Sequence, residues 1–412
     1  MKRKRIVQGS LIAAAVLVLT LAVIFFRRYL PDSFLIAEDT PLYLAQTPYV
    51  TVHSPKHTDS ESVDVSLRTG THSAQLRLFG VIPIKTVWVK ETAEQTVLVS
   101  GAPFGIKLFS DGVMVVGFSD IYTENGYQNP AKNAGIRMGD TVRSVSGQAV
   151  ADNDDIREKV EDSQGRPISV TFERKGEQKT VFVTPVRDRS TGVYRIGMRV
   201  RDSSAGIGTL TCIDPADNIF AGLGHAITDV DTDEIIDVRS GEIAEVSITG
   251  VIPSSAGSPG ELKGILSMAA AGTILQNDET GVYGTVSGTK LFAGTAMPVA
   301  MRQDVVVGDA VICTCVDGDT PKNYTVTIER ISYNESSPNK NMILRVTDER
   351  LLRETGGIVQ GMSGSPIVQN GRLVGAVTHV LVNDPTRGYA IFAENMMETA
   401  QNVSGKAQQK AA

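Results

Sequence analysis

The longest apolar stretch of the chain lies near its N-terminus. Residues 6–26 contain no charged side chain, and they lie between the basic cluster Lys2-Arg3-Lys4-Arg5 and the pair Arg27-Arg28. A helix of about 20 apolar residues crosses a bilayer, whereas the apolar region of a cleaved signal peptide has roughly 7–15 residues. The pattern predicts a retained transmembrane anchor over residues 1–28, with the basic cluster in the cytoplasm and the body of the protein outside it. A removed export signal is the alternative, and it also exports the body.

Beyond the anchor, short alternating stretches predict β-structure. Residues 29–98 alternate apolar and polar positions in short runs, as in Thr86-Val87-Trp88-Val89, and predict a β-rich spacer. Residues 189–402 contain short apolar strands separated by turns, with few helical periods, so a sandwich or a pair of small barrels is expected. Residues 403–412 are expected to form a polar tail.

Composition narrows the range of functions. A chain of 412 residues supports two or three domains, and 42% hydrophobic with 21% charged residues is typical of a globular protein. The net charge of -6 argues against nucleic acid as the main ligand, because phosphate binding normally goes with a basic excess. Only three cysteines are present, which excludes a disulfide-dense scaffold.

Residues 99–188 carry a more specific pattern. A short helical turn over residues 130–134 ends at a glycine, a Gly-Asp turn leads into an alternating strand, and residues 151–160 begin with the Asx and acidic side chains of a helix N-terminus. This stretch resembles the PDZ domains of bacterial proteases, which bind an extended peptide at a sheet edge. The resemblance implies a peptide partner bound at the loop Phe104-Gly105-Ile106-Lys107-Leu108. The resemblance leaves three candidate ligands for this domain: the C-terminal carboxylate of a peptide, an internal peptide segment, or this chain's own N-terminal region.

The candidate chemistry is concentrated at residues 356–380. Asn370-Gly371 between apolar runs predicts a tight hairpin, and Ser363 lies in the Gly-rich turn before it. Glycines on both sides of Ser363 leave room for a substrate carbonyl and allow the N–H groups of Gly361 and Ser363 to form an oxyanion hole. The loop resembles the nucleophile loop of chymotrypsin-like serine peptidases, which makes Ser363 rather than Ser365 the nucleophile; its sequence is Gly361-Met362-Ser363-Gly364-Ser365-Pro366.

A nucleophilic serine needs a general base and an acid that orients the base. His225 lies among small residues and precedes Ser363, as in the chymotrypsin-like order, so it is expected to be the base. Thr378 and His379 follow the hairpin, where the resemblance places substrate-pocket residues; a role as the base is the alternative for His379. Spacing alone does not choose the acid among the Asp residues between His225 and Ser363, of which Asp304 and Asp348 are candidates.

Several motifs together resemble the SpoIVB peptidase family. They are the anchor, the PDZ pattern, Gly224-His225-Ala226, the run T-G-G-I-V-Q-G-M-S-G-S-P-I around Ser363, and G-A-V-T-H-V after it. The resemblance implies a mainly β fold, with a chymotrypsin-like double β-barrel peptidase domain over 189–402 preceded by an α+β PDZ domain and a transmembrane helix. It implies a serine endopeptidase whose catalytic residues are His225, Asp348 and Ser363, and it favours Asp348 over Asp304.

The resemblance also implies a biological role. Such a protein would be anchored in the forespore membrane with its body in the intermembrane space, would cleave itself near its N-terminal region, and would be released afterwards. Its protein partner would be the regulatory subunit of a membrane-embedded metalloprotease complex, whose cleavage releases processing of the late mother-cell sigma factor. No cofactor and no metal are expected. The alternatives are an inactive peptidase fold that works as a PDZ scaffold, and a general envelope quality-control protease of the HtrA type.

Overall fold

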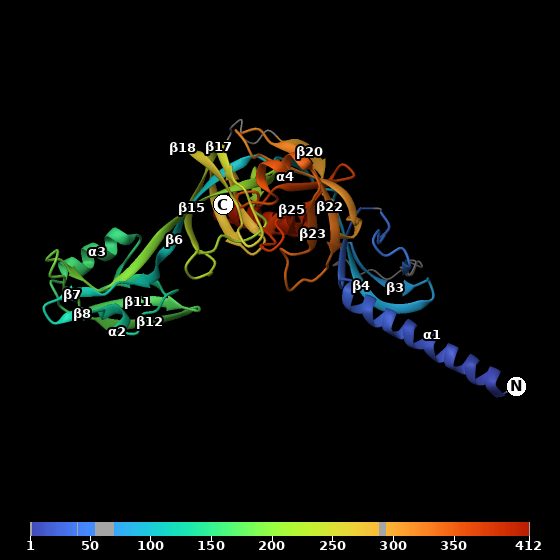
Figure 1. Cartoon of the computed structure of the whole chain (residues 1–412), viewed down its shortest axis with the longest axis horizontal. Coiled ribbons are helices and arrows are strands. Elements are labelled where there is room, and N and C mark those ends of the chain that lie inside the picture. The colour runs from blue at the N-terminus through green and yellow to red at the C-terminus, as the bar shows by residue number, and fades with distance from the viewer. Residues whose placement is uncertain (1, 39, 54–69, 288–293, 412) are drawn as a thin grey trace, which may run out of the picture.

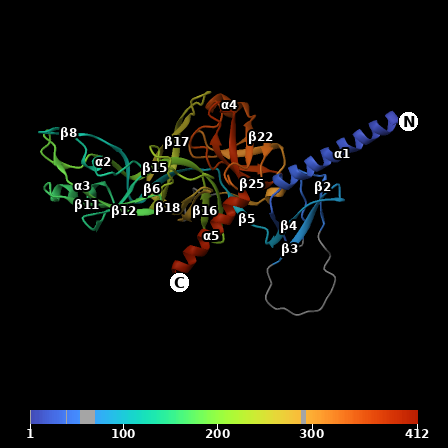
Figure 2. The same cartoon turned by 90° about the horizontal axis from the view of Figure 1, so that it is seen from below.

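The computed structural model describes residues 2–38, 40–53, 70–287 and 294–411. Helix α1 (Lys2–Tyr29) projects from one end of an elongated molecule, and the PDZ elements lie at the opposite end (Figures 1 and 2). The segment Val7–Tyr29 has a mean hydropathy of 2.7 and is long and apolar enough to cross a membrane. The end of α1 is attached to the body, because the Tyr29 hydroxyl donates to the carbonyl of Ile331 at 3.3 Å.

The segment expected to be a spacer folds as a four-stranded sheet with a buried side. Its strand order is β1-β4-β3-β2, and β1 runs parallel to β4. Phe34, Leu76 and Val87 of this sheet are buried in one hydrophobic cluster with residues of the C-terminal barrel. The sheet is therefore packed on the catalytic body; its strands are β1 (Ser33–Ala37), β2 (Val50–His53), β3 (Thr71–Leu78) and β4 (Ile82–Thr92).

Two closed barrels follow in the chain. The C-terminal one closes in the order β21-β22-β23-β26-β25-β24. The other closes because β6 pairs with both β17 and β15, which completes the cycle β6-β17-β18-β19-β16-β15. The expected double β-barrel is thus present. The strands are β6 (Pro103–Phe118), β15 (Met198–Asp214), β16 (Ile219–Gly222), β17 (Val238–Ile252), β18 (Glu261–Asp278), β19 (Gly281–Val286), β21 (Gly308–Thr314), β22 (Lys322–Ile331), β23 (Met342–Val346), β24 (Pro366–Gln369), β25 (Arg372–Val380) and β26 (Arg387–Phe392).

The PDZ domain has its own hydrophobic core, and it shares two strands with the first barrel. Strands β6 and β15 are long enough to serve both: their barrel halves pair around residues 103–109, and their outer halves join the PDZ sheet β12-β11-β9-β6. Asp152 caps α3 by accepting from the N–H of Asp155, as the acidic pattern predicts. The remaining elements are β7 (Ile121–Thr123), β8 (Gly126–Gln128), α2 (Pro130–Asn133), β9 (Thr141–Val145), β10 (Gln148–Ala149), α3 (Asn153–Asp162), β11 (Ile168–Arg174), β12 (Glu177–Val183), β13 (Val186–Arg187) and β14 (Tyr194–Arg195).

Short elements complete the body. The end of the chain differs from the expected tail, because α5 continues through residues 403–411. Its buried face, with Met396 and Val403, packs against β16 and β19 of the first barrel and β25 and β26 of the second. The periodic apolar positions Met396, Ala400 and Val403 carry this helix past the segment that composition alone makes polar. The elements are β5 (Thr96–Val99), β20 (Thr295–Pro298), the 3-10 helix η2 (Arg302–Asp304), α4 (Glu349–Thr355) and α5 (Ala393–Ala411).

Candidate active site

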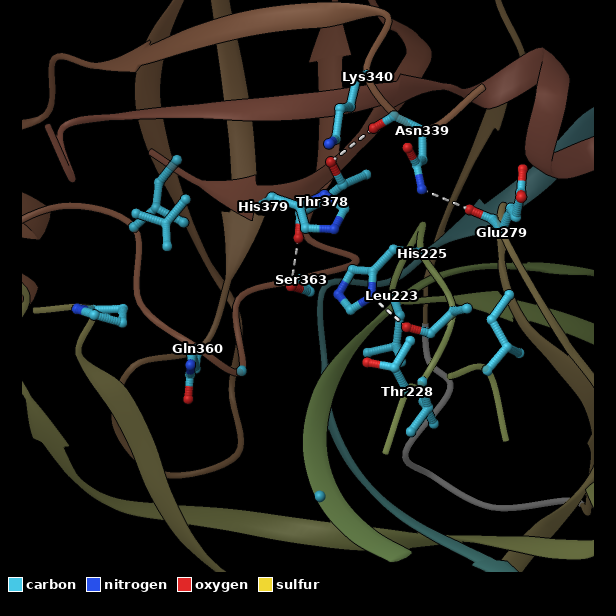
Figure 3. A pocket seen from close by; sticks show the side chains of 18 of the residues that line it. Leu223, His225, Thr228, Glu279, Asn339, Lys340, Gln360, Ser363, Thr378 and His379 are labelled. Atoms are coloured by element: carbon cyan, nitrogen blue, oxygen red, sulfur yellow. Dashed lines mark hydrogen bonds between the residues drawn. The ribbon is translucent and has the colours of Figure 1, made fainter. Parts of the chain in front are cut away.

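A cavity of about 720 Å³ opens between the two barrels and contains the predicted nucleophile and base. Ser363 reaches it from the loop before β24, and His225 from the loop after β16 (Figure 3). Thr378 and His379, expected in the substrate pocket, line the same cavity from β25. Residues that are far apart in the sequence are thus brought to one site.

The loop that carries Ser363 is held by the first barrel. In β15, the Thr209 N–H donates to the carbonyl of Ser363 at 2.9 Å, and its hydroxyl donates to the carbonyl of Gly361 at 2.8 Å. The Thr211 hydroxyl donates to the carbonyl of Gly364 at 2.7 Å. Gly361 and Gly364 have φ values of +98° and +93°, which side chains rarely tolerate, so glycine is needed on both sides of Ser363. The carbonyls of this loop therefore point toward the barrel.

The N–H groups of the same loop are left for a ligand. Among the described residues, neither the N–H of Gly361 nor that of Ser363 donates a hydrogen bond, although the N–H groups of Gln360, Met362 and Gly364 all do. Unpaired N–H groups at an accessible site are suited to bind an anion that forms during a reaction. This is the arrangement that the oxyanion-hole interpretation of Gly361 and Ser363 requires.

The hydroxyl of Ser363 donates to the backbone carbonyl of Thr378 at 2.7 Å. In this rotamer the proton of Ser363 is not shared with an imidazole (Figure 3). Attack on a substrate therefore requires the Ser363 hydroxyl to exchange this hydrogen bond for one to His225.

His225 is half-buried in the wall of the cavity and is held by its own backbone. Its Nδ1 lies 2.7 Å from the carbonyl oxygen of Ala226. Burial lowers the pKa of His225 below that of a free imidazole, and the bond to Ala226 partly opposes this. His225 is therefore uncharged at neutral pH, which is the state a general base needs.

His379 packs against His225. The two ring centroids lie 4.7 Å apart with an angle of 35° between the rings. Burial, followed by repulsion from His225 and Lys340, lowers the pKa of His379 to about 4. Its Nδ1 is buried without a hydrogen-bond partner among the described residues. A neutral His379 can therefore stand beside His225 without charge repulsion.

The lowered pKa of His379 has a measurable consequence for stability. Between the ordinary pKa of 6.5 and the folded-state pKa of about 4, the unfolded chain binds a proton at residue 379 that the folded chain does not bind. The free energy of unfolding should therefore fall as the pH is lowered through this range. We expect His379→Gln to lose less stability than the wild type between pH 7 and pH 4.5, measured as urea midpoints. Parallel losses in both proteins would contradict this.

The two candidate acids lie outside the cavity. Asp348 caps α4, and its carboxylate accepts from the Arg350 guanidinium at 2.8 Å and from the N–H groups of Arg350 and Leu351. The Arg350 guanidinium and these N–H groups hold the pKa of Asp348 well below its usual value. Asp304 lies in η2, and burial raises its pKa. Within the described residues, no hydrogen bond or ion pair joins His225 to a carboxylate.

The predicted peptide-binding loop, residues 104–108, lies elsewhere. Phe104, Ile106 and Leu108 are buried in the core of the first barrel, and β6 is paired there with β15 on one side and β17 on the other. No edge is free to receive a peptide, so this prediction was wrong. The prediction rested on the hydrophobic–Gly–hydrophobic triplet Phe104-Gly105-Ile106. Such a triplet has the same sequence whether its strand lies at the edge of a sheet or between two neighbouring strands.

A free edge exists instead at the start of β15. Residues 198–201 pair with β6 on one side only, among the described residues, and α3 packs beside them. Gly197, with φ +82°, precedes this edge, and its carbonyl accepts from the N–H of Ser119 and from Asn129. The signal that could have found it is the triplet Ile196-Gly197-Met198, which repeats the hydrophobic–Gly–hydrophobic pattern directly before a strand.

Comparison with known families agrees with this geometry. The model of the SpoIVB peptidase S55 family matches residues 192–397, half of the chain. The chain belongs to the SpoIVB peptidase family. A PDZ-domain model matches residues 114–184, which excludes the Phe104–Leu108 segment and agrees with the outer half of β6 as the start of that domain. A member of the SpoIVB family with this cavity is a serine endopeptidase.

Curated relatives and solved structures match only parts of the chain. A candidate zinc metalloprotease of Lactococcus lactis is 33% identical over 17% of this chain, and one of Treponema pallidum is 27% identical over 26%. The chain spans 16% and 26% of the lengths of these two relatives. The HtrA-type protease AlgW with a decapeptide has 12% identity and a TM-score of 0.30, and covers 52% of this chain and 57% of its own. The PDZ domain of an SdrC-like protein from Listeria monocytogenes has 16% identity and a TM-score of 0.19, and covers 22% of this chain and 90% of its own.

Proposed function

We propose that this SpoIVB-family peptidase is membrane-anchored, cleaves itself, and signals across the forespore envelope during sporulation. Its substrate would be the regulatory subunit of an intramembrane metalloprotease complex, and the cut would activate processing of the late mother-cell sigma factor. The observation that carries the hydrolytic part is the cavity in which Ser363, His225 and two unpaired N–H groups meet. Membership of the SpoIVB family supports the sporulation role.

The reaction follows from the positions of these groups. In the active rotamer, the Ser363 Oγ attacks a peptide carbonyl while the unprotonated Nε2 of His225 takes the hydroxyl proton and then gives it to the leaving amine. The N–H groups of Gly361 and Ser363 bind the oxyanion, and loss of one such donor costs about 3–4 kcal/mol in a related site. The acid role of Asp348 stays a prediction from the family, because its carboxylate binds Arg350 in this structure.

The anchor and the PDZ domain would direct the enzyme to its substrate. Helix α1 would hold the body at the outer face of the membrane, and a tether raises the effective concentration of a substrate held in the same membrane. The free edge of β15 beside α3 would receive an extended peptide by strand addition. We propose that this peptide is the N-terminal region of the chain before self-cleavage, and that release from the membrane follows the cut.

Self-cleavage can be tested on the full chain. We expect purified wild type to yield fragments whose N-termini lie between the end of α1 and the PDZ domain, and Ser363→Ala to yield none of them, because only the wild type has the attacking hydroxyl. N-terminal sequencing of the fragments from both proteins measures this and locates the cut sites.

Two results would contradict the proposal. Identical fragments from wild type and Ser363→Ala would mean that another protease makes the cuts, and a PDZ scaffold without hydrolysis would then be left. Fragments present only in the wild type, but together with ready hydrolysis of unfolded casein, would favour general quality control over signalling. In the structure the Ser363 hydroxyl is bonded to the carbonyl of Thr378 and not to His225. The casein assay therefore also tests whether the enzyme is active without its own protein substrate.

A further inference from the structure

Part of the apolar face of helix α1 is packed against the folded body. One stripe of the helix is partly buried against the hydrophobic cluster that includes β3 and β4 of the N-terminal sheet; its residues are Leu19, Ala22, Val23 and Phe26. Both views show these strands beside the helix (Figures 1 and 2). The segment that is apolar enough to cross a membrane begins at Val7, so only twelve of its residues precede Leu19.

The length of the helix sets the height of this sheet. Twelve residues of α-helix span about 18 Å, whereas the hydrocarbon core of a bilayer is about 30 Å thick. Counted from Lys2, where α1 begins, the helix before Leu19 still spans only about 26 Å. The next turns of the helix must therefore lie at the level of the membrane. Ile82, the first residue of β4, packs against the same cluster as these turns, so a spanning α1 draws this end of the sheet into the outer surface of the bilayer.

The turn at this end of the sheet exposes apolar side chains. Between β3 and β4, the side chains of Phe79 and Val81 are 62% and 77% exposed. The ring of Tyr49, also 62% exposed, lies edge-on to that of Phe79 with 5.9 Å between the centroids. The Phe79 N–H donates to the carbonyl of Tyr49 at 2.8 Å, which holds the two residues together. Aromatic side chains of this kind are enriched where a protein meets the surface of a bilayer.

The backbone of this turn makes its phenylalanine unusual. Phe79 has a φ of +53° and precedes Gly80, whose φ is +75°. Among the described residues, three other hairpin turns have the same pair of left-handed residues, and they begin with Ser146, Lys175 and Asn370. A polar residue or glycine is favoured at such a position, and a bulky apolar residue there costs conformational energy. An exposed phenylalanine kept in this conformation therefore points to a function.

We propose that the turn at residues 79–81, together with Tyr49, is a second membrane contact of this protein. The side chains of Phe79, Val81 and Tyr49 insert beside α1 at the outer boundary between acyl chains and headgroups. Arg27 and Arg28, exposed at the end of α1, can reach the lipid phosphates at the same level. This inference rests on the proposed membrane anchor. The added contact fixes the tilt of the body relative to the membrane, which a single helix leaves free.

The fluorescence of one tryptophan tests this in the full chain. Trp88 is the only tryptophan, so Trp88→Phe gives a background without any, and Ser363→Ala keeps the chain intact if self-cleavage occurs. In this background, Phe79→Trp, Val81→Trp and Lys175→Trp each place a single reporter. Lys175→Trp is the matched control, because it lies in the same kind of turn on the PDZ domain, at the opposite end of the molecule (Figure 1).

The measurement is quenching by lipid. Each protein is reconstituted in phosphatidylcholine vesicles with or without bromine atoms on the acyl chains near the headgroup. We expect Phe79→Trp and Val81→Trp to lose about half or more of their emission in the brominated vesicles, because interfacial side chains lie about 5–10 Å deep, where the bromines are. Lys175→Trp should lose almost none.

Flotation of the vesicles separates this inference from the proposed anchor. If the chain floats with the vesicles but Phe79→Trp and Val81→Trp are quenched no more than Lys175→Trp, the turn lies outside the membrane and the inference fails, while the anchor stands. Equal and strong quenching of all three reporters would mean that the body adsorbs in no fixed orientation, and would also overturn it. If the chain does not float, the anchor itself fails. Val81→Trp remains decisive if Phe79→Trp does not fold, because φ at residue 81 is not positive.

Discussion

Replacing Ser363 by alanine is expected to reduce peptide hydrolysis on the order of 10⁶-fold, as removal of the nucleophile does in subtilisin. The Ser363 hydroxyl lines the same cavity as the imidazole of His225 and belongs to the loop that carries the two unpaired N–H groups, so its removal takes away the expected nucleophile. The Thr209 bonds to the loop involve backbone atoms of residues 361 and 363, and alanine leaves them intact. Hydrolysis of a peptide that spans the mapped self-cleavage site measures the effect.

The matched control is Ser365→Ala. Ser365 lies two residues away, is fully buried, and donates its hydroxyl to the carbonyl of Met362 at 2.6 Å. It cannot reach a substrate, so its loss should cost about 1 kcal/mol of stability and leave Ser363 reactive. Loss of hydrolysis in Ser365→Ala together with full activity in Ser363→Ala would reverse the assignment of the nucleophile.

Gly364→Ala is expected to have the largest effect on stability. Gly364 has a φ of +93°, and a Cβ there would overlap the carbonyl oxygen of Thr209 and lie 2.5 Å from the N of Leu223. These are backbone atoms of the first barrel, which cannot rotate away as a side chain can. We therefore expect a loss of more than about 4 kcal/mol, or failure of the two barrels to close around the cavity.

Gly371→Ala provides the comparison for Gly364→Ala. Gly371 also has a positive φ, +74°, but a Cβ there meets no atom within 4 Å. Gly371→Ala should lower the free energy of unfolding only by the cost of placing alanine in the left-handed conformation, about 1–2 kcal/mol. Thermal unfolding of both variants measures the difference. Equal melting temperatures would show that the backbone at Thr209 moves to make room for a Cβ at position 364, and would contradict the prediction.

Local patterns in the sequence predicted the catalytic loop well. The pair Asn370-Gly371 forms the expected tight turn between β24 and β25, with φ values of +52° and +74°. The glycines around Ser363 have the positive φ values that the motif requires. These features depend on a few neighbouring residues, and residue types such as Asn-Gly restrict the backbone strongly.

Features that depend on distant partners were not predictable. An alternating pattern predicts that residues 103–109 form a strand, but not that both of its edges are covered, which is why the peptide-binding loop was misplaced. The motif of Asp348 does not predict that its carboxylate caps α4 and binds Arg350, and its acid role stays a prediction from the family.

Strand β15 runs from the PDZ edge at Met198 to Thr209, whose N–H and hydroxyl hold the nucleophile loop. Its eleven steps span at most about 36 Å at roughly 3.3 Å per residue, and its register with β6 shifts between Arg201 and Ser203, where the PDZ half of the strand meets the barrel half. One strand therefore carries both the free edge beside α3 and the two hydrogen bonds that hold the loop of Ser363. If a peptide adds to that edge, as proposed, a single stretch of backbone sets its position relative to the nucleophile.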